Sequence, residues 1–204
     1  MHKLDLTHTL AAAALAWGIA VTAAPAQQPA DRIAGAVESF DGQVLAVKSE
    51  QLGEVKISMA DNTMLLGVAK ATVADIKAND YIGVGALPQA DGSQRAIQII
   101  IFTEQQRGVG EGHYPWQAHP NNTMTNGAVD ETVASVDGPV LMVKYKGGQQ
   151  KIVVPPEAVI RAYVVGDKSE LKPGARVAVL RVVKKPDGSL EASRVNIGRG
   201  DVVP

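Results

Sequence analysis

Two histidines, His113 and His119, lie six residues apart in Glu104 to Gly127, the one long stretch of this chain without a counterpart elsewhere in it. Glu111 precedes the first histidine by two residues, and Met124 follows the second by five. Imidazole beside a carboxylate suits Zn²⁺ or Cu²⁺, and imidazole beside a thioether suits copper. These four side chains form a candidate copper or zinc site. Two imidazoles do not fill a tetrahedral site, so a further ligand must come from elsewhere.

The same stretch carries the aromatic residues Tyr114 and Trp116, which can anchor a long loop on a folded body. On that interpretation the histidines hydrogen-bond to backbone and bind no metal. The sequence alone leaves both interpretations open. The glycines between Gly108 and Gly112 do not predict a phosphate-binding loop, because such a loop needs a helix N-terminus after it and His-Tyr-Pro-Trp follows instead.

Charge is divided unevenly along the chain. Residues 27–102 carry a net charge of −3, whereas residues 128–204 carry +3. The basic excess predicts either docking between two oppositely charged domains or a basic face that meets a lipid headgroup, a polysaccharide or an acidic envelope protein. Nucleic acid is not expected, because the basic part has only Tyr145 and Tyr163 for stacking. The candidate partner-binding residues are Tyr114, Trp116, Arg181, Lys184 and Lys185.

Catalytic constellations are weak in this sequence. The chain contains no cysteine, which excludes thiolate metal sites, redox pairs and a cysteine nucleophile. No G-x-S-x-G segment is present, and the carboxylates are scattered, several of them in turns where aspartate is favoured. We therefore expect a protein that is not an enzyme.

Residues 1–26 have the order of features typical of a secretory signal peptide. Lys3 precedes the apolar run Leu10–Val21, and small residues follow it as far as Ala26. The run is too short for a membrane-spanning helix, which takes about 20 residues. We expect cleavage after Ala23 or Ala26, export to the periplasm, and a mature chain without a transmembrane segment.

The mature chain contains two copies of one unit. Phe40-Asp41-Gly42 matches Val136-Asp137-Gly138, and Asp75-Ile76-Lys77 matches Glu170-Leu171-Lys172, with an offset of 95 or 96 residues. An offset this long indicates duplicated domains and not a solenoid of short repeats. The predicted boundaries are a repeat over 31–103, a linker over 104–127, a second repeat over 128–199 and a tail over 200–204.

Each copy is expected to form a small strand meander. In the first copy, strands are predicted over Ile33–Phe40, Gln43–Lys48, Glu54–Met59, Tyr81–Leu87 and Gln94–Phe102, with Asp41-Gly42 as a two-residue hairpin turn. Thr72 to Asp75 predicts one capped helical turn. In the second copy a strand is predicted over Val140–Tyr145. The predicted fold is all-β, with two tandem small antiparallel β-barrels of the OB or SH3-like kind joined by a long ordered linker.

The shared pattern V-x-S-x-D-G-x-x-L-x-V-K, then D/E-[IL]-K, then D-G-S-x-x-A resembles a family of tandem exported bacterial domains of unknown function. The linker words GEGHYPW and TMTNG are similar to segments of uncharacterised exported proteins from alphaproteobacteria. These motifs are turn and core residues, so the resemblance implies a fold and no catalytic residue. The function expected is binding or scaffolding in the cell envelope. The alternative is periplasmic handling of copper or zinc by the linker histidines.

Overall fold

The computed structural model describes residues 32–116, 119–136 and 138–204, and the predicted signal peptide lies outside them. The described part is all-β, and its only helical elements are three short 3-10 turns. The first half contains β1 (Arg32–Phe40), β2 (Val44–Ser49), β3 (Gly53–Lys70), η1 (Val73–Asp75), β4 (Tyr81–Pro88), β5 (Gln94–Ile101) and η2 (Glu104–Gln106). The second half contains β6 (Gly112–Pro115), β7 (Thr123–Val133), β8 (Val140–Tyr145), β9 (Gly148–Val153), β10 (Val159–Val165), η3 (Lys168–Glu170), β11 (Arg176–Lys184) and β12 (Leu190–Gly198).

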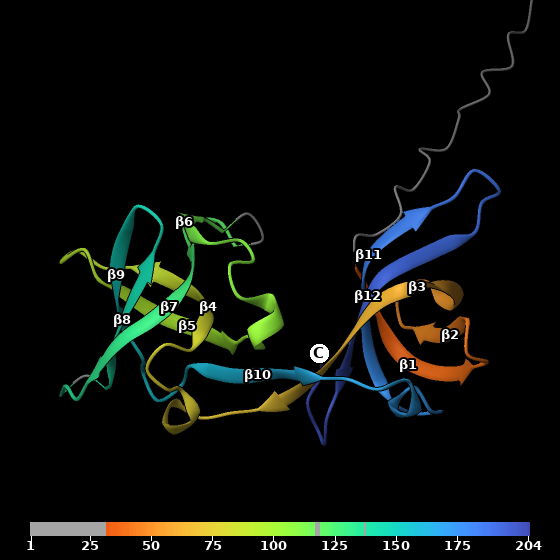
Figure 1. The fold of residues 1–204 in the computed structure, drawn as a ribbon, viewed down its shortest axis with the longest axis horizontal. Coiled ribbons are helices and arrows are strands. Elements are labelled where there is room, and N and C mark those ends of the chain that lie inside the picture. The colour runs from red at the N-terminus through yellow and green to blue at the C-terminus, as the bar shows by residue number, and fades with distance from the viewer. Residues whose placement is uncertain (1–31, 117–118, 137) are drawn as a thin grey trace, which may run out of the picture.

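Five strands form a closed barrel in the order β1-β2-β3-β12-β11, with β3 and β12 completing the ring as a parallel pair. Its core contains apolar side chains that alternate with outward-facing residues, as expected for strands with one buried face. We call this barrel and η3 the first lobe (Figure 1). Its buried core residues are Ile33, Val37, Leu45, Val47, Ile57, Met59, Leu171, Val177, Val179, Val182, Ala192, Val195 and Ile197.

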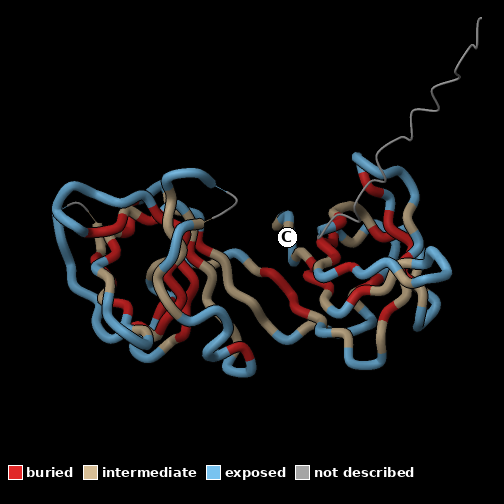
Figure 2. Tube along the Cα trace, turned by 90° about the horizontal axis from the view of Figure 1, so that it is seen from above, coloured by how far each residue is buried: buried red, intermediate tan, exposed pale blue. Residues whose placement is uncertain are grey.

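The second lobe is built around a separate core, visible as a second group of buried residues (Figure 2). Its strands pair in the order β5-β4-β7-β8-β9, and β5 meets β9 through two residue pairs only. Its core residues are Ile76, Ile82, Val84, Ala86, Ala96, Ile99, Val129, Leu141, Val143, Ile152, Val154 and Ile160.

The predicted tandem arrangement, with one barrel per repeat, is not confirmed, because each core contains strands from both halves of the chain. The first lobe joins β1, β2 and β3 to β11 and β12, and the second joins β4 and β5 to β7, β8 and β9. The predicted boundaries at 103 and 128 therefore do not separate the two cores. A repeat pattern identifies equivalent strands, but it does not determine which of two equivalent strands pairs with a given neighbour.

The crossing between lobes is made by β3 and β10. β3 runs on to Lys70, well beyond the predicted end at Met59, and its last part pairs antiparallel with β10. The pair Val68↔Tyr163 lies at the centre of five cross-strand pairs, and these two residues are 95 residues apart, the offset that relates the two copies predicted from the sequence. The crossing therefore has an approximate two-fold axis at this pair, and each half sends its last strands into the other lobe.

Local turn chemistry agrees with the sequence only in part. The capped turn at Thr72 is confirmed, since Asp75 Oδ2 accepts a hydrogen bond from the Thr72 backbone N–H at 2.8 Å. The two-residue hairpin at Asp41-Gly42 is wrong, because three residues separate β1 from β2. Only Gly42 there has a positive φ, and the Asp41 carboxylate accepts the N–H groups of Gln43 and Val44 instead. An aspartate-centred turn therefore takes the place of the expected two-residue hairpin turn.

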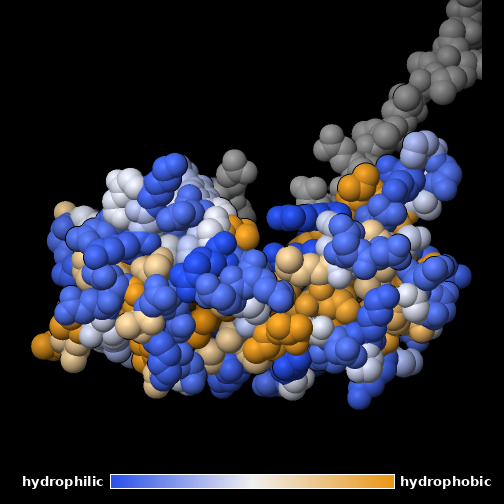
Figure 3. All heavy atoms as spheres, in the orientation of Figure 1, coloured by the Kyte–Doolittle hydropathy of each residue, from blue (hydrophilic) through white to orange (hydrophobic). Residues whose placement is uncertain are grey.

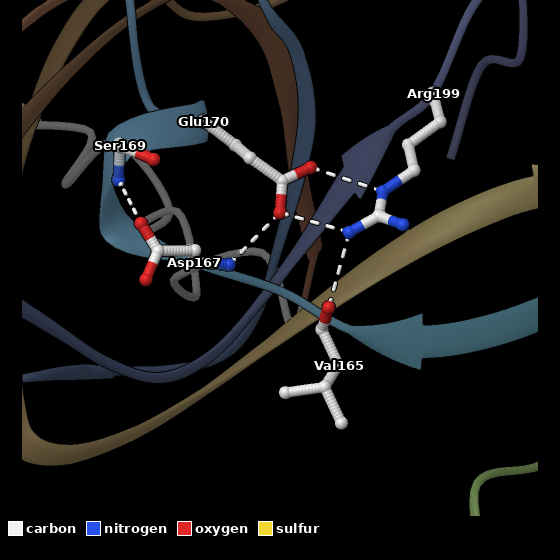
Figure 4. Close-up of polar contacts among 5 residues, drawn as sticks. All are labelled: Val165, Asp167, Ser169, Glu170 and Arg199. Carbon is white, nitrogen blue, oxygen red and sulfur yellow. Dashed lines mark hydrogen bonds and ion pairs between the residues drawn. The ribbon is translucent and has the colours of Figure 1, made fainter.

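One arginine joins the crossing to the first lobe (Figure 4). Arg199 donates from Nε and Nη2 to the two carboxylate oxygens of Glu170, each at 3.0 Å, and from Nη2 to the Val165 carbonyl at 3.1 Å. Its guanidinium lies over Gly67, where a Cβ would come within 2.5 Å of Nε. We call this contact set the Arg199 clasp. It ties η3, the ends of β10 and β12, and the last part of β3 together.

Candidate functional site

The described residues of the linker, 104–116 and 119–127, pack against the second lobe. η2 follows β5 directly, β6 pairs with β7, and β7 begins at Thr123, four residues before the predicted end of the linker. Trp116 covers Gly85 on the outer face of β4, where a Cβ would come within 2.5 Å of the indole. The interpretation of Trp116 as an anchor for the loop therefore agrees with its contacts.

The four predicted metal ligands are engaged in separate structural contacts. His113 Nδ1 lies 2.8 Å from Thr125 Oγ1, and the His119 ring packs on Trp116 with centroids 4.1 Å apart. Glu111 accepts the backbone N–H of Lys146 at 2.9 Å, and Met124 lies in β7 paired with Gly85 and Tyr114.

Within the described residues, no group of three or more His, Cys, Asp or Glu side chains could hold a metal ion. Burial lowers the pKa of His113 below its ordinary value of 6.5, which favours the neutral ring. The contacts of these residues therefore support a structural role for the histidines.

The predicted partner-binding residues are divided between the two lobes. Tyr114 and Trp116 lie on and beside β6 in the second lobe, whereas Arg181 and Lys184 are exposed on β11 in the first lobe. Lys185 follows β11 and forms an ion pair with Glu191 at 2.8 Å. The predicted basic residues Arg181, Lys184 and Lys185 therefore lie on the first lobe, apart from Tyr114 and Trp116 on the second, and a basic binding face stays a prediction.

A surface that the sequence did not suggest lies at the crossing. Ile160 enters the second core and Val195 enters the first, so the alternate residues Arg161, Tyr163 and Arg194 lie on the opposite face of the same sheet. Lys70 is directly opposite Arg161 in the register of β3 with β10. Phe102, just after β5, packs against Tyr163 with ring centroids 5.7 Å apart. We call Lys70, Phe102, Arg161, Tyr163 and Arg194 the junction face.

The junction face combines stacked rings with cations. The Arg194 guanidinium carbon lies 4.9 Å from the Tyr163 ring centroid, and Asn196 Oδ1 holds the Arg194 Nε–H at 3.0 Å. Phe102 also packs on Tyr81, so the row of rings continues into the second lobe. Apolar side chains gather on the visible face over the crossing strands, with strongly hydrophilic ones beside them (Figure 3).

The cations of this face have no acidic partner among the described residues: Lys70, Arg161 and Arg194 form no ion pair with a described carboxylate. Lys70 and Arg161 are like charges directly opposite each other on neighbouring strands, an arrangement that destabilises a sheet. An anion bound between them would relieve that repulsion.

A pocket of about 330 Å³ offers a second candidate at the other end of the second lobe, where β5 meets β9. Its cations are Arg95 and Lys151, and its carboxylate is Asp91. Arg95 forms an ion pair with Glu157 at 2.6 Å, and Asp91 Oδ1 accepts the Ser93 hydroxyl at 2.6 Å. Because Arg95 and Asp91 already bind partners within the protein, we consider this pocket a weaker candidate than the junction face.

Comparison with family models, with curated proteins and with solved structures finds no match to this chain. The evidence for function is therefore the geometry of the site itself. No helix within residues 32–116, 119–136 and 138–204 has the length and apolar character needed to cross a membrane.

Proposed function

We propose that this protein is an exported, periplasmic binding or scaffolding protein without enzymatic activity, and that the junction face is its ligand-binding surface. The ligand we propose is an acidic polysaccharide. The observation that carries the proposal is the row formed by Arg194, Tyr163 and Phe102 beside the opposed cations Lys70 and Arg161. The signal-like N-terminus supports export, and it lies outside the described residues.

The chemistry of the face fits a chain of uronic acids. The apolar face of a sugar ring can pack on an aromatic ring and remove apolar area from water on both sides. Carboxylates spaced along such a polymer would pair with Arg161 and Arg194, whose planar guanidinium groups suit a carboxylate. Tyr163 and Phe102 are half-buried and pack on each other. A bilayer would instead favour protruding apolar side chains, which makes a lipid surface the weaker candidate.

The test is isothermal titration calorimetry of the mature protein with polygalacturonate, with dextran as the neutral polymer and phosphatidylglycerol vesicles as the lipid arm. Arg161→Glu and Tyr163→Ala are each expected to weaken binding about tenfold or more, since one lost contact of about 1.4 kcal/mol is a factor of ten. Lys184→Glu is the matched control, because Lys184 is an exposed cation on β11 outside the junction face.

Three outcomes would overturn the proposal. Equal loss of binding in Lys184→Glu and Arg161→Glu would mean that net charge alone attracts the polymer. Equal affinity for dextran would remove the role of the cations. Binding to vesicles but not to polygalacturonate would assign the face to a membrane surface.

A further inference from the structure

The backbone pairings of the two lobes do not by themselves specify which half supplies which strand. β1 pairs with β11 through Gly35↔Val177, and β7 pairs with β4 through Gly127↔Ile82, at equivalent positions of the two repeats. The next contact is also equivalent in the two lobes. Gly174 N–H donates to the Val37 carbonyl at 2.9 Å, and Asn79 N–H donates to the Val129 carbonyl at 2.7 Å.

Because these contacts are repeated, β1 has two strands with matching residues to pair with: β11, as observed, or β4 of its own half. The same holds for β7. The choice must come from a feature that the repeats do not share. The linker, residues 104–127, is the one long segment of this chain that matches no other segment in it.

One linker carbonyl contacts both strands whose pairing is in question. The Val109 carbonyl accepts the Tyr81 hydroxyl of β4 at 3.2 Å and the Asn126 side-chain amide of β7 at 3.2 Å. Trp116 covers Gly85 of β4, while the preceding β6 is hydrogen-bonded along β7. These contacts form together only when β4 and β7 are neighbours.

The linker also contacts Asn79, whose N–H donates the second-lobe hydrogen bond to the Val129 carbonyl. Arg107 Nη2 donates to the Asn79 carbonyl at 2.9 Å, and its guanidinium carbon lies 5.9 Å from the Tyr81 ring centroid. Glu104 orients that guanidinium through bonds of 2.6 Å to Nε and 2.7 Å to Nη2. Asn79 is the residue whose N–H holds β7, so the linker fixes the residue that joins the first half to the second.

We infer that the linker, residues 104–127, selects the exchanged pairing of the two halves. It holds β4 against β7 of the same chain and so leaves β1 to pair with β11. When these contacts are removed, β4 is free to pair with β1 of its own half or with β7 of a second copy of the chain. This inference is independent of any ligand at the junction face.

The chain contains no cysteine, so one introduced pair reports the pairing directly. Ala36 and Arg176 are cross-strand partners on β1 and β11. Cross-strand Cα separations of about 4.5–5.5 Å fall within the range that a disulfide accepts. Ala36→Cys with Arg176→Cys, refolded and oxidised, should give an intrachain disulfide in a monomer when the linker is intact.

A second variant removes the linker contacts: it combines Tyr81→Phe, Trp116→Ala and Asn126→Ala with the same two introduced cysteines. We expect the intrachain product to fall at least severalfold, replaced by disulfide-linked dimers or by monomers that contain no disulfide. Dimers would show exchange with a second copy, and unlinked monomers would show pairing within each half, and either result supports the inference. An unchanged yield of intrachain disulfide in a folded monomer would overturn it.

Two controls keep the result interpretable. Leu171→Ala on the reporter removes a buried side chain of the first core and destabilises the protein without touching the linker, so its intrachain yield should stay high. If the triple variant does not fold, Tyr81→Phe alone removes one linker hydrogen bond, and its intrachain yield should fall measurably as refolding concentration is raised. No change at any concentration would contradict the inference.

Discussion

Replacing Glu170 with Gln tests the energetic role of the Arg199 clasp. The carboxylate accepts two bonds from Arg199 at 3.0 Å each and one from the Asp167 N–H at 2.9 Å. Hydrogen bonds to charged groups contribute about 1.5–3 kcal/mol when buried. The Glu170 side chain is 25% exposed and that of Arg199 is 42% exposed, so solvent screening reduces the expected value to about 1 kcal/mol. For a mature chain of roughly 180 residues, that loss lowers the unfolding midpoint by about 2–4 °C.

The pH dependence gives a second measurement of the same contact. The hydrogen bond from Arg199 lowers the pKa of Glu170 below its ordinary value of 4.5. The stabilisation is therefore complete above pH 4.5 and is lost as pH falls through the lowered pKa of the folded state. Thermal unfolding followed by circular dichroism at pH 7 and pH 3 should show a difference between wild type and Glu170→Gln that shrinks at the lower pH.

Glu104→Gln is the matched control for this experiment. Glu104 binds Arg107 with similar geometry, but its side chain is 77% exposed. We expect Glu104→Gln to leave the unfolding midpoint nearly unchanged. The reasoning is refuted if the two variants lower the midpoint equally at pH 7, or if the effect of Glu170→Gln is the same at both pH values.

Three further predictions follow from local contacts. Gly85→Ala places a Cβ 2.5 Å from the Trp116 ring, so we expect a loss of about 1–3 kcal/mol in the free energy of unfolding and a red shift of Trp116 fluorescence. NMR titration of His113 should give a midpoint below 6.5, because burial disfavours its protonated form; stability should fall as pH drops below 6.5, where the unfolded chain takes up the proton first. N-terminal sequencing of protein exported by a bacterial host should begin at Gln27 or Ala24, and an intact Met1 would contradict the signal-peptide assignment.

Local elements were largely predictable from the sequence, because alternation and turn chemistry act over a few residues. The predicted strand Val140–Tyr145 is confirmed, and β4 and β5 begin at their predicted residues, Tyr81 and Gln94. Capping at Thr72 is also confirmed, because its partner Asp75 lies only three residues away.

Which strands pair within each lobe was not predictable in the same way, because that pairing depends on contacts between strands far apart in the sequence. One available signal was missed. Gly35-Ala36-Val37 and Gly127-Ala128-Val129 are identical and occupy the same place beside a β-bulge in β1 and β7. Aligning these two segments places the start of the second copy inside the predicted linker. It also shows that the connection from β7 to β8 is longer than the connection from β1 to β2. The linker then ends in a strand, β7, that begins at Thr123.

The junction face was missed because its residues are far apart in sequence and are brought together only by the crossing.

The approximate two-fold axis at Val68↔Tyr163 relates Lys70 to Val165 and Arg161 to Leu66. The backbone of the crossing is therefore nearly symmetric, but its side chains are not. Both cations lie at one end of the ribbon, and both aliphatic residues lie at the other. A purely structural crossing would gain nothing from two like charges placed opposite each other, since they repel across the strand pair. Two cations at one end of the ribbon would instead serve the proposed function, since they supply the positive charge that an anionic ligand would meet.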